Sequence, residues 1–403
     1  MEAQTSGRNQ MKEKPVTETQ KSCKLKKISE STILAAVIGI VLRILCYSYV
    51  RPFLMKRPEL TSPLVSYRRL QDGVAMFNDG ISPYEGDSFH FQPVLLRLYS
   101  LGSASERTVF TISTILDCLT AALLSISAGH YAKQQKSANP EHVCIMVFKC
   151  YLWNPVTIGC TAILSVSVLH NVLISAFVYF FCSGLLLPCV LVLSLCISLS
   201  IYPVIIAASV LLRFSSLHQR ILTLFCLTSG FVAMLIFNWF LNNMNWNFLD
   251  DTYGFILRVD DLTPNVGLFW YFFTQVFEHF RVFYLVVFQI NLLVYVVPLL
   301  LSLRKDAYLH LVISLLLMAV FSSYPTLNDA STYLALLPML DKYWKYPRYT
   351  LVVSCTIVTC VVLMPVMWHI WIVVGSGNAN FYFAVTLIYN IAQTFPNPPN
   401  STL

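Results

Sequence analysis

Long apolar runs separated by short polar segments occupy most of this chain. A helix needs roughly 20 mainly apolar residues to cross a bilayer, and many of the runs approach that length. The pattern predicts an all-α, multi-pass transmembrane helical bundle with about 10–12 membrane segments. The predicted segments lie at about 33–50, 108–129, 143–164, 168–187, 189–213, 221–241, 281–303, 308–324, 329–340, 349–374 and 379–394.

Prolines interrupt several of these runs, so we expect some membrane helices to be short or broken. Such breaks are tolerated where neighbouring helices or a cavity satisfy the freed backbone groups. The interrupting residues are Pro155, Pro203, Pro298, Pro325, Pro338 and Pro365.

Composition supports a membrane protein, because 56% of the residues are apolar and only 12% are charged. Soluble domains carry about 25% charged residues. This shortage excludes a soluble enzyme, a disordered protein and a nucleic-acid-binding protein. Long continuous runs favour helices over a barrel, whose strands would alternate in hydrophobicity.

We expect three regions: a disordered basic cytosolic tail over 1–32, a polytopic membrane domain over 33–394, and a short tail over 395–403. The tail and the predicted lumenal loop at about 51–107 each hold seven Lys or Arg, so their charges do not decide the orientation. Long loops translocate largely regardless of charge. On this basis the N-terminus is placed in the cytosol and loop 51–107 in the lumen.

The second polar stretch contains an aromatic interfacial segment at about 262–280, LTPNVGLFWYFFTQVFEHF. Seven Phe, Trp or Tyr lie between Phe269 and Phe280. Aromatic side chains gather at the level of lipid headgroups, and an amphipathic stretch lying in the interface has this composition. Two interpretations stay open: an ordinary interfacial anchor, or a wall against which a glycolipid packs.

Polar residues within the apolar runs are candidates for function, because they are costly in a membrane. Their alternative role is hydrogen bonding between helices. Arg43 and Lys149 can extend to an interface, whereas Asp117 and His170 have no long stem. The remaining candidates are Asn154, Asn171, Glu278, His279, Gln289, Asn291, Asn328, Asp329, His369, Asn378, Asn380 and Asn390.

No metal site or cofactor is expected. The chain has no Asp-x-Asp pair for a nucleotide-bound metal, and Asp250-Asp251 and Asp260-Asp261 are adjacent pairs. A transferase base could lie among the scattered acids of the first loop, although nothing marks one. These acids are Glu59, Asp72, Asp79, Glu85 and Asp87. The cysteines, mostly within apolar runs, are expected to be structural.

The stretch YGFILRVDDLTPNVGLFWYFFTQVFEHF (253–280), followed by VFQIN (287–291), resembles the most characteristic part of the phosphatidylinositol-glycan class U family. Shorter matches extend the resemblance over roughly 33–394. They are SPLVSYRRL (62–70), GISPYEG (80–86), LWNPVTI (152–158), SIYPV (200–204), SYPTLNDA (323–330) and PVMWHIWIVVGSGNANFYFAVTL (365–387).

This resemblance implies a multi-pass subunit of the GPI transamidase in the endoplasmic reticulum membrane. It implies a non-catalytic role, with the catalytic cysteine on a partner subunit. The other transamidase subunits and the GPI glycolipid are the implied partners, and no nucleic acid is expected. The family also implies a scaffold similar to GT-C glycosyltransferases and further membrane sequence after Thr394.

Within this family we expect two lipid-binding surfaces. The first is the aromatic wall of Phe269, Trp270, Tyr271, Phe272 and Phe273 with Glu278 and His279. The second is the polar helix start at Asn378, Asn380 and Phe381, where free backbone N–H groups favour phosphate.

The alternative function is a GT-C mannosyltransferase of GPI-precursor assembly that uses dolichol-phosphate mannose. It requires an essential acid in the first loop, such as Asp72 or Asp79. A transporter is a weaker alternative, because no inverted repeat is visible in the sequence.

Overall fold

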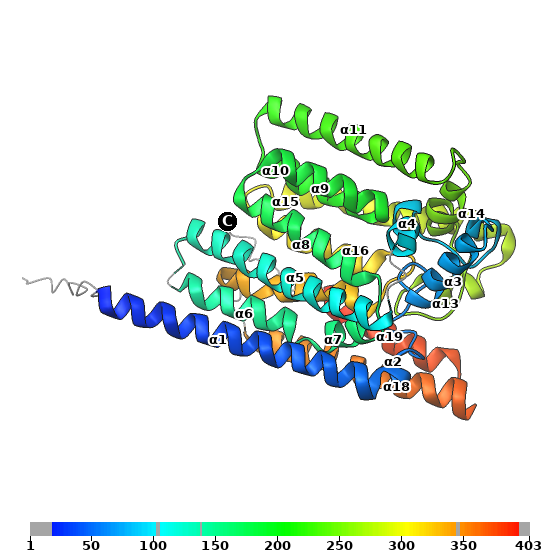
Figure 1. The fold of residues 1–403 in the computed structure, drawn as a ribbon, viewed down its shortest axis with the longest axis horizontal. Coiled ribbons are helices and arrows are strands. Elements are labelled where there is room, and N and C mark those ends of the chain that lie inside the picture. Colours follow the sequence, from blue (N-terminus) through cyan, green and yellow to red (C-terminus); the bar gives the residue numbers. More distant parts are fainter. Residues whose placement is uncertain (1–17, 102–104, 138, 344–346, 395–403) are drawn as a thin grey trace, which may run out of the picture.

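The computed structural model describes residues 18–101, 105–137, 139–343 and 347–394. This part of the chain is helical and contains no strand. The long helices lie side by side along one direction (Figure 1). The predicted all-α, multi-pass class is therefore confirmed.

The first half of the bundle is built from α1, the short helices of the first polar stretch and the helices that follow it. Their bounds are α1 Glu18–Leu45, η1 Cys46–Val50, α2 Arg51–Leu54, α3 Tyr67–Asn78, η2 Pro83–Glu85, α4 Pro93–Leu101, α5 Glu106–Gln134, α6 Pro140–Leu152, α7 Pro155–Ala162, α8 Ser167–Ser183, α9 Leu186–Leu199, η3 Tyr202–Ile206 and α10 Ala207–Arg213.

The second half contains the central polar stretch and the C-terminal hairpin. Its elements are α11 Leu217–Leu241, η4 Asp250–Gly254, α12 Phe255–Arg258, α13 Phe269–Gln275, α14 Glu278–Val294, α15 Val296–Ser302, α16 Ala307–Phe321, η5 Leu327–Ala330, α17 Ser331–Leu336, η6 Leu337–Tyr343, α18 Pro347–Trp368, η7 His369–Val374 and α19 Ala379–Thr394.

Five helical segments among the described residues are long and apolar enough to cross a membrane: Glu30–Leu54, Glu106–Gln134, Leu217–Leu241, Glu278–Ser302 and Thr350–Val374. The pair α6 and α7, bent by 45° ahead of Pro155, adds a sixth when the two helices are counted as one broken span. Gly184 ends α8 with a φ of 77°. Pro203 lies in η3, between α9 and α10, and divides the predicted run 189–213 into shorter helices. The count of 10–12 membrane segments stays a prediction.

The two polar stretches pack against each other at one end of the bundle. Figure 1 shows α3, α4 and α13 together at the end opposite the start of α1. Leu70 and Phe89 of the first stretch share a buried apolar cluster with Phe248 of the second. Arg69 forms an ion pair with Asp261 at 3.0 Å. This end of the bundle is therefore a folded cap rather than a set of independent loops.

The tail boundary differs from the prediction. Helix α1 begins at Glu18, so residues 18–32 are helical. The last proline before this helix is Pro15, and the next glycine is Gly39. No residue between them is a strong helix breaker, which explains the early start. The predicted tail at 395–403 lies outside the described residues.

Candidate functional site

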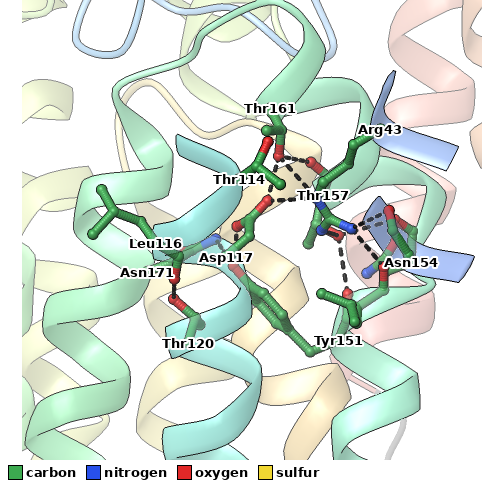
Figure 2. A network of polar contacts seen from close by, with 12 residues as sticks. Arg43, Thr114, Leu116, Asp117, Thr120, Tyr151, Asn154, Thr157, Thr161 and Asn171 are labelled. Atoms are coloured by element: carbon green, nitrogen blue, oxygen red, sulfur yellow. Dashed lines mark hydrogen bonds and ion pairs between the residues drawn. The ribbon is translucent and has the colours of Figure 1, made fainter. Parts of the chain in front are cut away.

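A buried ion pair joins the first helix to the body of the bundle. Arg43 on α1 donates from Nε to Oδ2 of Asp117 on α5 at 2.9 Å, and both side chains are excluded from solvent. The guanidinium also donates to the backbone carbonyls of Gly39 and Leu152, at 3.2 and 2.8 Å. Figure 2 shows the Arg43 and Asp117 side chains pointing toward each other.

The surrounding side chains complete this network. Tyr151 donates its hydroxyl to Asp117 at 3.0 Å and accepts from the amide of Asn171 at 3.0 Å. Thr161 donates to the same carboxylate, and Thr157 accepts from Arg43 at 3.2 Å. Because a buried charge is tolerable only when paired and hydrogen-bonded, this network is a structural tie between α1, α5, α6, α7 and α8.

The prediction that Arg43 extends to an interface is therefore wrong. Asp117, whose side chain is short, is the ion-pair partner of Arg43, although 74 residues separate the two in the sequence. The sequence indicated both residues as candidates because each is a polar residue within an apolar run. Only the packing of α1 on α7 and α5 brings their side chains together. Lys149 lies with its ammonium 5.3 Å from the Trp153 ring centroid.

The predicted aromatic wall is largely part of the core. Phe269, Trp270 and Phe273 are buried, and Tyr271 and Phe272 are partly exposed. Trp270 packs against Trp371, Tyr382 and Phe383 of the C-terminal hairpin, with centroids 6.0–6.2 Å away. The inward-facing rings follow a helical spacing, and they attach α13 to its neighbours. Only part of the segment can therefore meet a ligand.

The two predicted surfaces form a single surface. Tyr271 on α13 stacks on Phe383 of α19 at 4.1 Å and donates its hydroxyl to Asn380 Oδ1 at 2.6 Å. This hydrogen bond spans 109 residues of sequence. The exposed ring of Phe381 lies beside Asn380 at the start of the same helix.

Part of the helix start at α19 is capped within the protein. Asn378 Oδ1 accepts from the backbone N–H of Asn380 at 3.0 Å and of Phe381 at 3.4 Å. An Asn before the first helical turn commonly caps it in this way. The carboxamides of Asn378 and Asn380 therefore form part of this edge, and its role in lipid binding stays a prediction.

Glu278 and His279 begin α14 and are exposed. The His279 ring contacts the neighbouring Phe280. Phe272 packs toward α14 through Phe288 and Tyr284. No described contact joins Glu278 or His279 to Asn378 or Asn380, so the structure does not bring these four residues together.

A buried acid lies below this surface and was not distinguished in the sequence. Glu59 is 3% exposed, and Tyr382 lies beside its carboxyl group. Burial raises the pKa of Glu59. The Glu59 carboxyl and the Tyr382 hydroxyl interact with each other, and Trp270 Nε1 has no hydrogen-bond partner among the described residues. Buried polar atoms usually have partners, so Trp270 leaves one unpaired donor beside Tyr271.

The paired acids of the central stretch form ion pairs. Asp250 and Asp260 both contact Arg258, at 2.5 and 3.0 Å. Asp251 is partly buried, and burial together with the neighbouring Asp250 raises its pKa to about 6. The first-loop acids Asp72 and Asp79 are exposed on or next to α3.

Together these features define a polytopic helical membrane protein with an amide-and-aromatic surface at its capped end. A profile of the family described as GPI transamidase subunit PIG-U matches residues 35–389. The chain therefore belongs to the PIG-U family of GPI transamidase subunits.

Curated relatives agree with the family assignment. The chain is 33% identical to GPI-anchor transamidase component PIGU of Mus musculus, with 89% of this chain and 90% of the relative covered. It is 31% identical to the Homo sapiens protein of the same name, with 90% of each covered. It is 28% identical to GPI transamidase component GAB1 of Saccharomyces cerevisiae, over 90% of this chain and 92% of that protein. These matches support a transamidase component and not the mannosyltransferase alternative.

Proposed function

We propose that this chain is a non-catalytic subunit that binds the GPI headgroup and presents it to the catalytic subunit of the transamidase. It would act in the endoplasmic reticulum membrane. The observation that carries the proposal is the joined surface of Tyr271 and Asn380. It couples an aromatic ring to the carboxamide of Asn380 at the capped end of the bundle.

The chemistry of this surface suits a glycolipid headgroup. Carboxamides both donate and accept hydrogen bonds, as sugar hydroxyls do, and the faces of Tyr271 and Phe381 offer apolar contact. The exposed apolar side chains of α14 and α18 continue below, where acyl chains would lie. Holding the GPI amine near an acyl-enzyme intermediate would contribute through positioning, which can supply several kcal/mol of a barrier.

The distribution of basic residues supports a lumenal position for this surface. The short connections at the end where α1 begins, 135–139, 184–185, 214–216 and 303–306, carry Lys136, Arg304 and Lys305. The short connections at the other end, 163–166, 200–201, 322–326 and 375–378, contain no Lys or Arg. Orientation follows Lys and Arg in short loops, so the end with Tyr271 and Asn380 would face the lumen.

A non-catalytic role is supported by the positions of the cysteines. Those whose side chains the structure describes lie in helices within or beside the membrane segments; five are buried, and Cys150 and Cys355 are exposed. A nucleophilic thiol needs a neighbouring base or cation to form the thiolate. Among these described cysteines, none has a hydrogen bond to a histidine. The covalent step is accordingly assigned to a partner subunit.

The test is to replace the surface residues in cells that lack the endogenous chain. Tyr271→Phe and Asn380→Ala should lower GPI attachment while the recovered complex stays intact. Ile391→Ala, at an exposed position of the same helix, is the matched control. Normal attachment in both surface variants would refute the proposed headgroup site, and loss of assembly would make these residues structural.

The lipids that accumulate when the chain is depleted give an independent test. Complete, fully mannosylated GPI together with uncleaved proproteins is expected for a block at attachment. A GPI precursor lacking one mannose would instead indicate a role in precursor assembly.

A further inference from the structure

Asn291 occupies an unusual position in the membrane domain. It lies near the middle of the 25-residue apolar helix Glu278–Ser302. At 1.5 Å per residue it is about 20 Å from Glu278, close to the centre of a bilayer core about 30 Å thick. Only 6% of the most apolar part of this helix is buried within the protein. Asn291 itself is partly exposed.

Other carboxamides in the membrane helices have hydrogen-bond partners, and Asn291 differs from them. Gln289, two residues earlier, donates to the carbonyl of Ile256 at 2.9 Å and to Ser323 at 3.1 Å. Asn238 and Asn390 each donate to backbone carbonyls and are buried. No hydrogen bond joins the Asn291 side chain to any described residue. Its donor and acceptor are therefore unpaired within the described chain, at a depth where lipid offers neither.

The same flank of α14 carries further unsatisfied polar groups. Tyr284 and Tyr295 lie seven residues before and four residues after Asn291, a spacing that places all three on one side of a helix. Neither tyrosine hydroxyl has a hydrogen bond to a described residue. Pro298 has no N–H to donate to the Val294 carbonyl, which frees a backbone acceptor one turn away. Leu292, at a different angle, is buried and faces the bundle.

We propose that the α14 flank of Tyr284, Asn291 and Tyr295 is the docking face for a transmembrane helix of another transamidase subunit. That helix would carry a hydroxyl or carboxamide at mid-membrane depth, which donates to and accepts from Asn291. The proposal rests on membership of a complex, as in the proposed function, but not on the headgroup site.

A protein helix fits this face better than lipid does. Acyl chains cannot satisfy an amide or a freed carbonyl in the bilayer core, whereas side-chain hydrogen bonds between helices do so. By contrast, the exposed face of α11 has apolar side chains such as Ile221, Phe225 and Ile236. The hydroxyls of Thr228 and Ser229 on that helix bond to their own backbone carbonyls, so lipid alone can cover it.

The experiment compares Asn291→Leu with Ile290→Leu, a neighbouring exposed position on another face of α14. After mild detergent extraction of the whole complex, Asn291→Leu should reduce recovery of one named transamidase subunit about threefold to tenfold. This range corresponds to one interhelical hydrogen bond in a membrane. Ile290→Leu should leave recovery unchanged. The thermal midpoint of the separately purified chain should be the same for both variants.

A photo-reactive side chain at Tyr295 should form a covalent adduct with that same subunit, and one at Phe225 on α11 should not. Absence of a subunit adduct at Tyr295 would overturn the proposal. A fall in the thermal midpoint of the isolated Asn291→Leu chain would also overturn it, because Asn291 would then stabilise the chain internally. Neither result would affect the GPI-headgroup tests at Tyr271 and Asn380.

Discussion

The network around Arg43 and the surface around Tyr271 use similar polar side chains in different ways. Arg43 and Asp117 are enclosed, and every neighbouring polar group bonds back to the protein. Tyr271 and Asn380 share one hydrogen bond at a more accessible site, and Trp270 Nε1 beside them has no hydrogen-bond partner among the described residues. Complete satisfaction marks the first region as structural, and the greater accessibility of the second is why we propose a ligand there.

The depth of each region explains this difference. The Arg43 network lies between membrane helices, where an unpaired charge has no water to solvate it. The Tyr271 surface lies at the capped end of the bundle, where polar groups can exchange partners. Variants that disturb the first region should therefore act on stability, and those in the second should act on GPI attachment.

Arg43→Leu should have the largest effect. It leaves Asp117 buried without its cation, and breaking a buried ion pair typically costs about 3–5 kcal/mol. The expected result is a much lower thermal midpoint and yield of the purified chain. The double variant Arg43→Met with Asp117→Leu should recover most of this loss, since both charges are then absent. A single variant with the stability of the parent chain would contradict the structural role.

Trp270→Ala should destabilise the chain next most strongly, by about 3 kcal/mol, because it removes a large buried ring. The side chain is 2% exposed and contacts Trp371 and Tyr382. Thermal unfolding of the detergent-solubilised chain measures this change. If Trp270→Ala instead reduced attachment with unchanged stability, the ring would belong to the ligand surface.

Tyr271→Phe should leave stability within about 1 kcal/mol of the parent chain, because it removes one hydrogen bond from a partly exposed site. Attachment of a reporter protein should nevertheless fall, by up to about fivefold, if Asn380 loses its orientation. Quantifying surface GPI-anchored reporter per assembled complex separates the two effects. An equal decrease in complex recovery and in reporter attachment would indicate a structural role.

Asp251→Asn should have the smallest effect, visible only in the pH dependence of stability. Burial and Asp250 raise the folded-state pKa of Asp251 to about 6 from 3.8. The folded state thus holds this proton more tightly, so the free energy of unfolding decreases as pH rises through this interval. Partial exposure limits the change to about 1 kcal/mol or less.

The D251N variant should therefore match the parent chain near pH 4 and be slightly more stable at pH 7.5. Thermal midpoints at both pH values test this. D250N is the opposing control, because Arg258 lowers the pKa of Asp250. Identical profiles for D251N and the parent would show that burial of Asp251 does not affect folding.

Much of the architecture follows from sequence because apolar runs and prolines act locally. Helices α5 and α11 contain the predicted runs 108–129 and 221–241, and the break ahead of Pro155 appears as the bend between α6 and α7. The early start of α1 shows the limit of this approach, since polar residues without a helix breaker can extend an apolar helix. The family assignment also came from sequence, through the motif at 253–280.

Only the tertiary structure decided which polar residues act together. Arg43 and Asp117, Tyr271 and Asn380, and Glu59 and Tyr382 are each far apart in sequence. Each pair forms because of the way the helices pack. Residue type and local spacing in the sequence do not determine that packing. For the same reason, the sequence marked both Trp270 and Tyr271 as wall residues, whereas packing buried the first and left the second beside Asn380.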